Sequence, residues 1–151
     1  MNDFIAKVFC LNDTKVGGYG DFKYNYEWKN QDEMMGAGSI TSNVSDLLKY
    51  GVCYLNDEKK YDYLKNAVRE RANIDDQYDI GMFWLIDRSS GLIWHNGEIE
   101  IEDENGKPVG YQSFIGILPQ KNKIVVVLSN AVCNADDGTA YTDILGYLLM
   151  E

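Results

Sequence analysis

The sequence predicts an α+β fold, in which an antiparallel β-sheet is covered by helices. Three helical patterns and a meander of strand-like segments lead to this prediction, because elements that each carry one apolar face bury those faces by packing as layers. The chain has 151 residues, of which 45% are hydrophobic and 25% are charged. This composition is typical of a compact globular protein, and we expect a single domain over residues 1–151.

Two helices are expected in the middle of the chain. Asn43 is a good N-cap, Asp46 lies in the first turn, and apolar residues recur at helical spacing over residues 44–55. The second helix covers about residues 58–71, where apolar residues at three- and four-residue spacing are separated by charged ones. That pattern is typical of a helix on the surface.

Two hairpins follow. Apolar runs at residues 80–86 and 92–95 flank the sequence DRSSG, which has the composition of a hairpin turn. Residues 98–103 and 109–117 are the expected arms of a second hairpin. Its tip, ENGK at residues 104–107, contains the Asn-Gly pair that favours a type I′ turn.

A strand and a helix close the chain. The β-branched run at residues 123–130 predicts a central strand. The final helix has Thr139 as its expected cap. Its apolar face consists of Tyr141, Ile144, Leu145, Leu148 and Leu149. No internal repeat interrupts this order, so all the elements belong to one layered unit.

Charge and hydropathy exclude two classes of partner. The net charge is −10, so nucleic acid is repelled. The longest apolar run, residues 124–128, is far shorter than the roughly 20 residues that span a bilayer. The N-terminus lacks a basic segment followed by an apolar one, so we expect no export signal in this chain. As it stands the chain would be cytoplasmic, and a longer parent with an upstream signal would be exported.

The cysteines and the single histidine do not form a metal-binding pattern. Cys10, Cys53 and Cys133 are widely separated and odd in number, which favours buried thiols. His95 is the only histidine, so a zinc site has no set of ligands. We therefore expect neither a metal nor another cofactor.

Three stretches carry a resemblance to a known family. GAGSITSNVSDLLKY at residues 36–50 is a glycine-rich turn into a helix, YDIGMFW at 78–84 has the form Tyr-x-x-Gly-x-x-Trp, and HNG at 95–97 precedes two strands. In this order they resemble the C-terminal part of the serine β-lactamase and penicillin-binding protein family, especially its class C-like branch with esterases and D-amino-acid peptidases. The resemblance implies a partial β-lactamase/transpeptidase-like fold and acyl transfer to serine, with hydrolysis of a β-lactam, peptide or ester.

The nucleophile of that family is missing from this sequence. In the family it is the serine of a Ser-x-x-Lys motif, whose lysine helps to remove the hydroxyl proton. No Ser-x-x-Lys occurs in these 151 residues, and Gly-x-Ser-x-Gly is absent too. Tyr54-Leu-Asn56 fits the Tyr-x-Asn motif formally, but it ends the first helix and we interpret it as packing. The chain is therefore expected to be inactive by itself.

By resemblance, the HNG segment forms one wall of a substrate cleft. His95 and Asn96 would face the substrate, and Gly97 would let the substrate backbone approach closely. The backbone N–H of Glu98 would donate into an oxyanion hole, where one donor is typically worth about 3 kcal/mol. The chain departs from the family by inserting residues 98–109 before the next strand, which lengthens the hairpin beside the cleft.

The inserted arm is strongly acidic. Glu98, Glu100, Glu102 and Glu104 alternate with isoleucines, so a regular strand places these carboxylates on one face. We interpret this row as a solvated face, since calcium needs ligands that converge from a bent loop. Carboxylates beside the HNG segment would also disfavour anionic ligands such as β-lactams.

Four aromatic residues near the N-terminus also alternate: Phe22, Tyr24, Tyr26 and Trp28. An extended segment would present them as one aromatic face. Packing within the protein is one use of such a face, and contact with a ligand by Tyr24, Tyr26 and Trp28 is the other.

The expected partners follow from the resemblance. The ligand would be a small peptide, a β-lactam or an ester. The family places N-terminal strands beside the strand that contains Val125, so here that edge would be unpaired and would bind an N-terminal complementing segment or a second copy. The alternative is a non-catalytic module that binds a peptide or a cell-wall fragment and turns nothing over.

Overall fold

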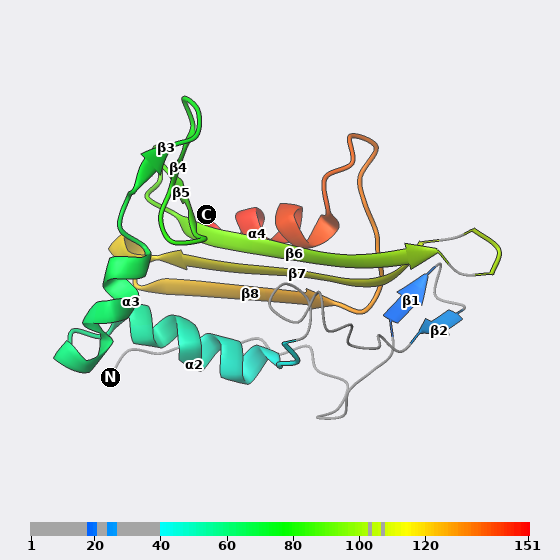
Figure 1. Ribbon diagram of the computed structural model, residues 1–151, viewed down its shortest axis with the longest axis horizontal. Coiled ribbons are helices and arrows are strands. Elements are labelled where there is room, and N and C mark those ends of the chain that lie inside the picture. Colours follow the sequence, from blue (N-terminus) through cyan, green and yellow to red (C-terminus); the bar gives the residue numbers. More distant parts are fainter. Residues whose placement is uncertain (1–17, 21–23, 27–39, 103, 107) are drawn as a thin grey trace.

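The computed structural model describes residues 18–20, 24–26, 40–102, 104–106 and 108–151. Within this part of the chain the main element is an antiparallel sheet with the strand order β3-β4-β5-β6-β7-β8 (Figure 1). Its strands are β3 (Ala72–Asn73), β4 (Tyr78–Ile80), β5 (Leu85–Asp87), β6 (Ile93–Glu102), β7 (Pro108–Leu118) and β8 (Lys123–Ser129). A second small sheet, β1 (Gly18–Gly20) and β2 (Tyr24–Tyr26), lies beside β7.

Helices cover both faces of the large sheet, so the predicted α+β architecture is confirmed. Helix α4 (Tyr141–Met150) packs over β7 and β8 on one face. Helix α2 (Val44–Leu55), the short 3-10 helix η2 (Lys59–Tyr61) and helix α3 (Asp62–Ala67) lie on the other (Figure 1). A further 3-10 turn, η3 (Pro119–Lys121), joins β7 to β8. No described helix is long and apolar enough to cross a membrane.

Strand alternation gives the sheet a hydrophobic cluster on each face. On the α4 face, Phe114 is 1% exposed and packs with Trp94 at a ring-centroid distance of 5.7 Å. The other members of this cluster are Leu92, Leu118, Val125 and Met150. On the α2 face, Ile117 is completely buried with Tyr54, Leu64, Trp84 and Ile93. Neighbouring residues such as Ile93 and Trp94 therefore belong to opposite cores.

Helix α2 is where the sequence predicts it. The side chain of Asn43 accepts a hydrogen bond of 2.9 Å from the Asp46 backbone N–H, which is the expected N-cap. The second helix is shorter than the predicted 58–71 and ends at Ala67. Beyond Ala67 the chain leaves the helix and turns into β3. The Arg71 N–H donates to the Ile80 carbonyl instead of to a helical carbonyl.

Two strand predictions need correction. Residues 80–86 are not one strand, since a turn at Gly81–Trp84 separates β4 from β5 and the Gly81 N–H donates to the Trp84 carbonyl at 2.8 Å. A Cβ at Gly81 would lie 2.5 Å from the Ala67 carbonyl oxygen, so glycine is required there. Conversely, the predicted strands at 92–95 and 98–103 are one continuous strand, β6.

The remaining hairpin details also differ. The β6–β7 connection spans residues 103–107 between the paired Glu102 and Pro108, which is longer than a two-residue type I′ turn. Gly106 there has a left-handed φ of 72°. Strand β8 is the last strand of the described sheet, not a central one. Its β-branched composition reflects burial by helices on both faces, which an edge strand shares with a central strand.

Helix α4 packs by a different face from the one that the sequence predicts. The buried residues are Thr142, Asp143, Gly146 and Met150. Tyr141, Leu145, Leu148 and Leu149, from the predicted apolar face, are 46–60% exposed. The N-cap is Ala140, not Thr139, because the Ala140 carbonyl accepts the first helical hydrogen bond, from the Ile144 N–H at 3.1 Å. Close approach explains the packing face, since a Cβ at Gly146 would lie 2.3 Å from the Phe114 ring.

We predict that Gly146→Ala lowers the free energy of unfolding by about 1–3 kcal/mol, because the added methyl overpacks the ring of Phe114. Urea unfolding of the purified chain measures this. Leu148→Ala in the same helix is the control and should change stability by less than about 0.5 kcal/mol, since Leu148 is 60% exposed. A Gly146→Ala variant as stable as the parent would show that α4 does not pack on Phe114.

Candidate functional site

The HNG segment, the predicted wall of a cleft, lies where β6 extends beyond the end of its neighbouring strand β5. Strand β5 pairs with β6 only at Ile93 and Trp94, whereas β7 pairs with β6 all the way to Glu102. From His95 onward, the outer edge of β6 therefore faces no strand among the described residues (Figure 1). The segment His95–Glu98 is thus the start of an open strand edge.

The hydrogen-bond pattern shows which backbone groups line this edge. The Asp87 N–H donates to the Leu92 carbonyl at 2.8 Å, so Leu92 and then every second residue of β6 turn their N–H and C=O groups toward the β5 side. Beyond β5 these are the groups of Asn96, Glu98 and the later even-numbered residues. The Glu98 N–H therefore points out of the open edge, which is the direction that an oxyanion donor at this position would need.

The hairpin turn before the site is held by one carboxylate. Asp87 is 6% exposed, and its Oδ1 accepts hydrogen bonds from the backbone N–H groups of Ser89 (2.9 Å) and Ser90 (2.8 Å) and from both hydroxyls. Burial raises the pKa of Asp87, but these hydrogen bonds outweigh it and hold the pKa below its ordinary value. The ionised carboxylate thus fixes the turn that sets the register of β6.

His95 is exposed and lies on the α2 face of the sheet. Its Nδ1 is 2.5 Å from the Asn96 carbonyl oxygen, so in the tautomer that carries its proton there the ring donates to its own strand. In the described part of the chain no carboxylate or hydroxyl bonds to the ring, and the hydroxyl of Ser113, across from Gly97, donates to the Gly97 carbonyl at 3.4 Å. Among the described residues, His95 is therefore not joined to a nucleophile.

Asn96 lies on the opposite face and is tied to helix α4. Its Nδ2 donates to Asp143 Oδ2 at 2.7 Å. Asp143 is 8% exposed, and its Oδ1 is buried without a hydrogen-bond partner in the described part of the chain. Burial raises the pKa of Asp143, the hydrogen bond from Asn96 opposes this rise, and the charge of Glu98 adds to it.

Gln112 ties the next residue of the site to the β8–α4 loop. Its Nε2 donates to Glu98 Oε2 at 2.5 Å and to Asn134 Oδ1 at 2.6 Å, and its Oε1 accepts from the Cys133 N–H at 3.1 Å. Gln112 is only 2% exposed. The side chains of Asn96 and Glu98 are thus both held by hydrogen bonds on the α4 face of the sheet. The groups that point outward from the edge of β6 are backbone groups.

The other predicted site features differ in their outcome. Glu98, Glu100 and Glu102 are exposed on the α4 face and Ile99 and Ile101 are half-buried on the other, as the alternation predicts. Among the described residues, no three His, Cys, Asp or Glu side chains gather as metal ligands. Tyr24 and Tyr26 form β2 near β7, and Trp28 lies outside the described residues.

Tyr54 belongs to the core. It is 7% exposed, its hydroxyl is 2.6 Å from the Tyr50 hydroxyl, and its ring packs edge-on against Trp84. Burial raises the pKa of Tyr54, which makes its hydroxyl a poorer source of a phenolate. The interpretation of Tyr54-Leu-Asn56 as packing is consistent with this position.

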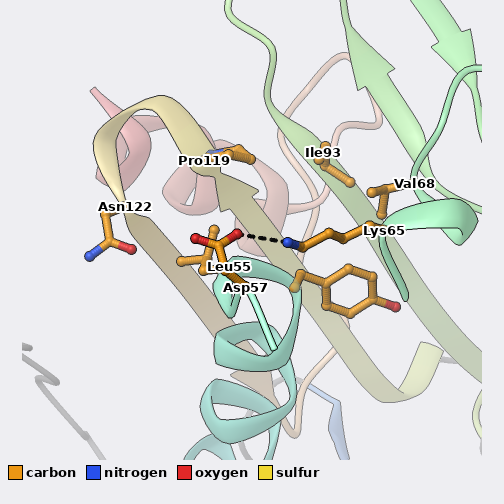
Figure 2. Close-up of a pocket in the computed structure, with 8 residues that line it drawn as sticks. Leu55, Asp57, Lys65, Val68, Ile93, Pro119 and Asn122 are labelled. Carbon is orange, nitrogen blue, oxygen red and sulfur yellow. Dashed lines mark hydrogen bonds and ion pairs between the residues drawn. The ribbon is translucent and has the colours of Figure 1, made fainter. Parts of the chain in front are cut away.

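A cavity of about 330 Å³ lies elsewhere, between α2, α3 and the start of β6 (Figure 2). It is lined mainly by apolar side chains, among them Leu55, Val68 and Ile93. At its mouth Lys65 Nζ pairs with Asp57 Oδ1 at 2.8 Å, and that hydrogen bond lowers the pKa of Asp57. Among the described residues its lining contains no serine, cysteine or histidine, and its Lys65 and Asp57 are paired with one another.

Comparison of the chain with protein-family models, with curated proteins and with solved structures finds no match.

Sequence reasoning missed Asp143 and Gln112. The sequence holds a local sign of each. Gln112 is two residues before the buried Phe114, so it lies on the same face of its strand, and Asp143 lies on the helix face opposite Leu145. A polar residue at an inward position needs a buried partner. The sequence does not show that the partners are Asn96, 47 positions away from Asp143, and Glu98.

We predict that Asp143→Asn stabilises the chain at pH 8 and that this gain shrinks as the pH falls toward 4. A raised pKa in the folded state means that ionisation of Asp143 opposes folding, so its cost grows as pH rises from the ordinary value of 3.8 through the raised one. Asparagine stays neutral and still accepts from Asn96. Urea unfolding at both pH values measures the difference.

Asp136→Asn is the control for this experiment, because it removes one negative charge from an exposed position of the β8–α4 loop. It should not reproduce the pH-dependent gain. If Asp143→Asn were instead less stable than the parent at pH 8, the carboxylate would be contributing favourably to the fold, contrary to the electrostatic argument.

Proposed function

We propose that this chain is the C-terminal portion of a β-lactamase-like serine hydrolase and that the open edge of β6 binds the acyl segment of its substrate. The observation that carries the proposal is the position of His95–Glu98, at the point where β6 extends beyond β5 with the Glu98 N–H directed outward. The HNG segment, the glycine-rich turn and the YDIGMFW stretch supply the resemblance.

The chemistry of this edge is that of backbone recognition. An extended acyl or peptide segment adds to a strand edge by pairing with its free N–H and C=O groups. The Asn96 N–H and the N–H and C=O of Glu98 are such groups, whereas the Asn96 carbonyl lies 2.5 Å from His95 Nδ1. The side chains of Asn96 and Glu98 are held by Asp143 and Gln112. A positioned N–H at the carbonyl of the substrate stabilises the oxyanion that forms during acyl transfer, by about 3 kcal/mol for one donor.

The nucleophile has to come from a segment outside these 151 residues, since no Ser-x-x-Lys occurs in them. We therefore expect no turnover by the chain alone. The row of exposed carboxylates at Glu98, Glu100 and Glu102 disfavours an anionic ligand along this face. Uncharged or cationic peptides and esters fit it better than β-lactams with their carboxylate.

The second candidate is a non-catalytic module that binds a peptide or a cell-wall fragment at the same edge. The absence of Ser-x-x-Lys and of a hydroxyl bonded to His95 in the described part of the chain favours it. Both candidates use the β6 edge, and they differ in whether a nucleophile is ever brought to it.

We predict that Glu98→Pro weakens binding of an uncharged, N-acetylated and C-amidated peptide about threefold to tenfold, the effect of losing one hydrogen bond of about 1 kcal/mol. Proline removes the outward N–H, and an edge strand tolerates it there. Glu98→Ala is the matched control, which keeps the N–H. Nitrogen-15 chemical shifts of residues 96–102 during a peptide titration give both affinities.

Equal affinities of the two Glu98 variants, or saturable shifts at other residues only, would exclude the β6 edge as the binding site. Hydrolysis of a chromogenic β-lactam or a p-nitrophenyl ester, together with a fluorophosphonate probe, tests for turnover. Specific labelling of a serine in this chain would overturn the expectation of inactivity. An in-frame Ser-x-x-Lys in the coding sequence upstream of Met1 would favour the hydrolase, and its absence would favour the binding module.

A further inference from the structure

The opposite edge of the sheet is a second open strand. Strand β8 pairs with β7 from Lys123 to Ser129, and no described strand pairs with its other side. Continuing the hydrogen-bond alternation across the sheet, the N–H and C=O groups of Ile124, Val126 and Leu128 point outward from β8. Within the described part of the chain these backbone groups are unpaired, and an apolar strand with an unpaired edge is a template for pairing with another strand.

Helix α4 places exposed leucines beside this edge. Asp143 reaches Asn96 on β6, so that side of the helix faces the β6 half of the sheet. Because each residue advances by 100°, Leu145 and Leu149 lie on the other side, toward β8. They are 46% and 47% exposed. The face that the sequence marks as apolar is therefore displayed next to the open strand.

Helix α2 places apolar side chains beside the β8 edge on the other face of the sheet. Gly51 lies on Ile124 of β8, where a Cβ would come within 2.7 Å of the isoleucine side chain. Tyr54 points toward Trp84, near β5, and the helical repeat then places Leu48 and Val52 on the side of the β8 edge. Both are only half-buried. The open strand is thus bordered by apolar side chains above and below the sheet.

We propose that β8 pairs antiparallel with β8 of a second copy of this chain, about a twofold axis that is perpendicular to the sheet and passes midway between the two Val126 residues. The outward groups then match, because Val126 faces Val126 of the copy and Ile124 faces Leu128 of the copy. The axis keeps each face of the sheet on its own side, so α4 meets α4 and α2 meets α2. The six-stranded sheets of the two copies become one continuous antiparallel sheet of twice six strands. Open sheets of this size do occur.

The spacing of the layers fits this arrangement. Helix α4 lies over β7 and β8. With strands about 4.8 Å apart, a helix centred between them lies about 5 Å from the twofold axis, so the two α4 helices would be about 10 Å apart. That value is at the upper end of the 8–10 Å at which helices pack directly. Leu145 and Leu149 then fill the space between the two helices.

Charge favours a second copy at this edge over the rest of the surface. The chain carries a net charge of −10, so two copies repel one another in most orientations. Strand β8 contains one charged residue, Lys123, which lies opposite Ser129 of the copy in the proposed register. Helix α4 contains one, Asp143, on the side away from the axis. Neither β8 nor α4 therefore places a carboxylate at the proposed contact.

The oligomeric state of the full chain tests the proposal. We predict that the chain is a dimer in analytical ultracentrifugation at a concentration on the order of 100 μM. We predict that Val126→Pro is a monomer. Proline deletes an N–H that points outward and leaves the β7–β8 ladder intact. Val126→Ala, which keeps that N–H, should remain a dimer. Leu145→Glu with Leu149→Glu should also give a monomer, by placing like charges between the α4 helices.

Ile74→Glu is the control for a charge added at an exposed apolar residue away from β8, since Ile74 is 49% exposed. It should stay dimeric. If Val126→Pro does not fold, as seen by circular dichroism, the α4 double variant decides. A monomeric parent chain, or a dimer that survives the α4 substitutions, would overturn the proposal and leave the edge to a strand from another protein or from this chain. The result does not depend on the ligand of the β6 edge. It concerns these 151 residues, since the resemblance places the N-terminal strands of a longer parent on the same β8 edge.

Discussion

The backbone ladder between β6 and β7 is the constraint on which the rest of the structure depends. It runs without interruption from Ile93↔Ile117 to Glu102↔Pro108. Because side chains alternate along a strand, this one register decides that Trp94, Asn96 and Glu98 face α4 while Ile93 and His95 face α2. The same alternation decides which backbone groups are consumed inside the sheet and which are left at its two edges. The candidate site and the proposed contact between copies are both consequences of it.

Local signals in the sequence predict those elements whose determinants are themselves local. Helix α2 begins at its predicted cap because Asn43 and Asp46 are three residues apart and satisfy one another. The β5–β6 hairpin is fixed within its own turn by Asp87. The break at Gly81–Trp84 has another cause, the closeness of the Ala67 carbonyl, which comes from an element distant in the sequence. A pattern of apolar residues does not contain that contact, so the two short strands were predicted as one.

The amphipathic pattern of α4 shows a related limit. The pattern identifies the apolar residues correctly, but it does not say which surface they meet. Gly146 and Met150 face the sheet instead, because only a residue as small as Gly146 lets the helix approach Phe114. For the candidate site, the sequence supplies only the HNG motif that suggests His95–Glu98. It does not supply the supports Asp143 and Gln112, since their hydrogen bonds join residues that only the fold brings together.

The hydrogen bonds of Gln112 have a consequence for the uniqueness of the fold. A slip of β6 against β7 by two residues would keep every side chain on its own face, so hydrophobic burial alone discriminates weakly between such alternatives. Gln112 is buried and uses both ends of its amide, toward Glu98, Asn134 and the Cys133 N–H. A two-residue shift of β6 would separate Glu98 from Gln112 and Asn96 from Asp143, while the bonds of Gln112 to the β8–α4 loop would stay. These two side-chain hydrogen bonds therefore favour one register of the β6–β7 hairpin.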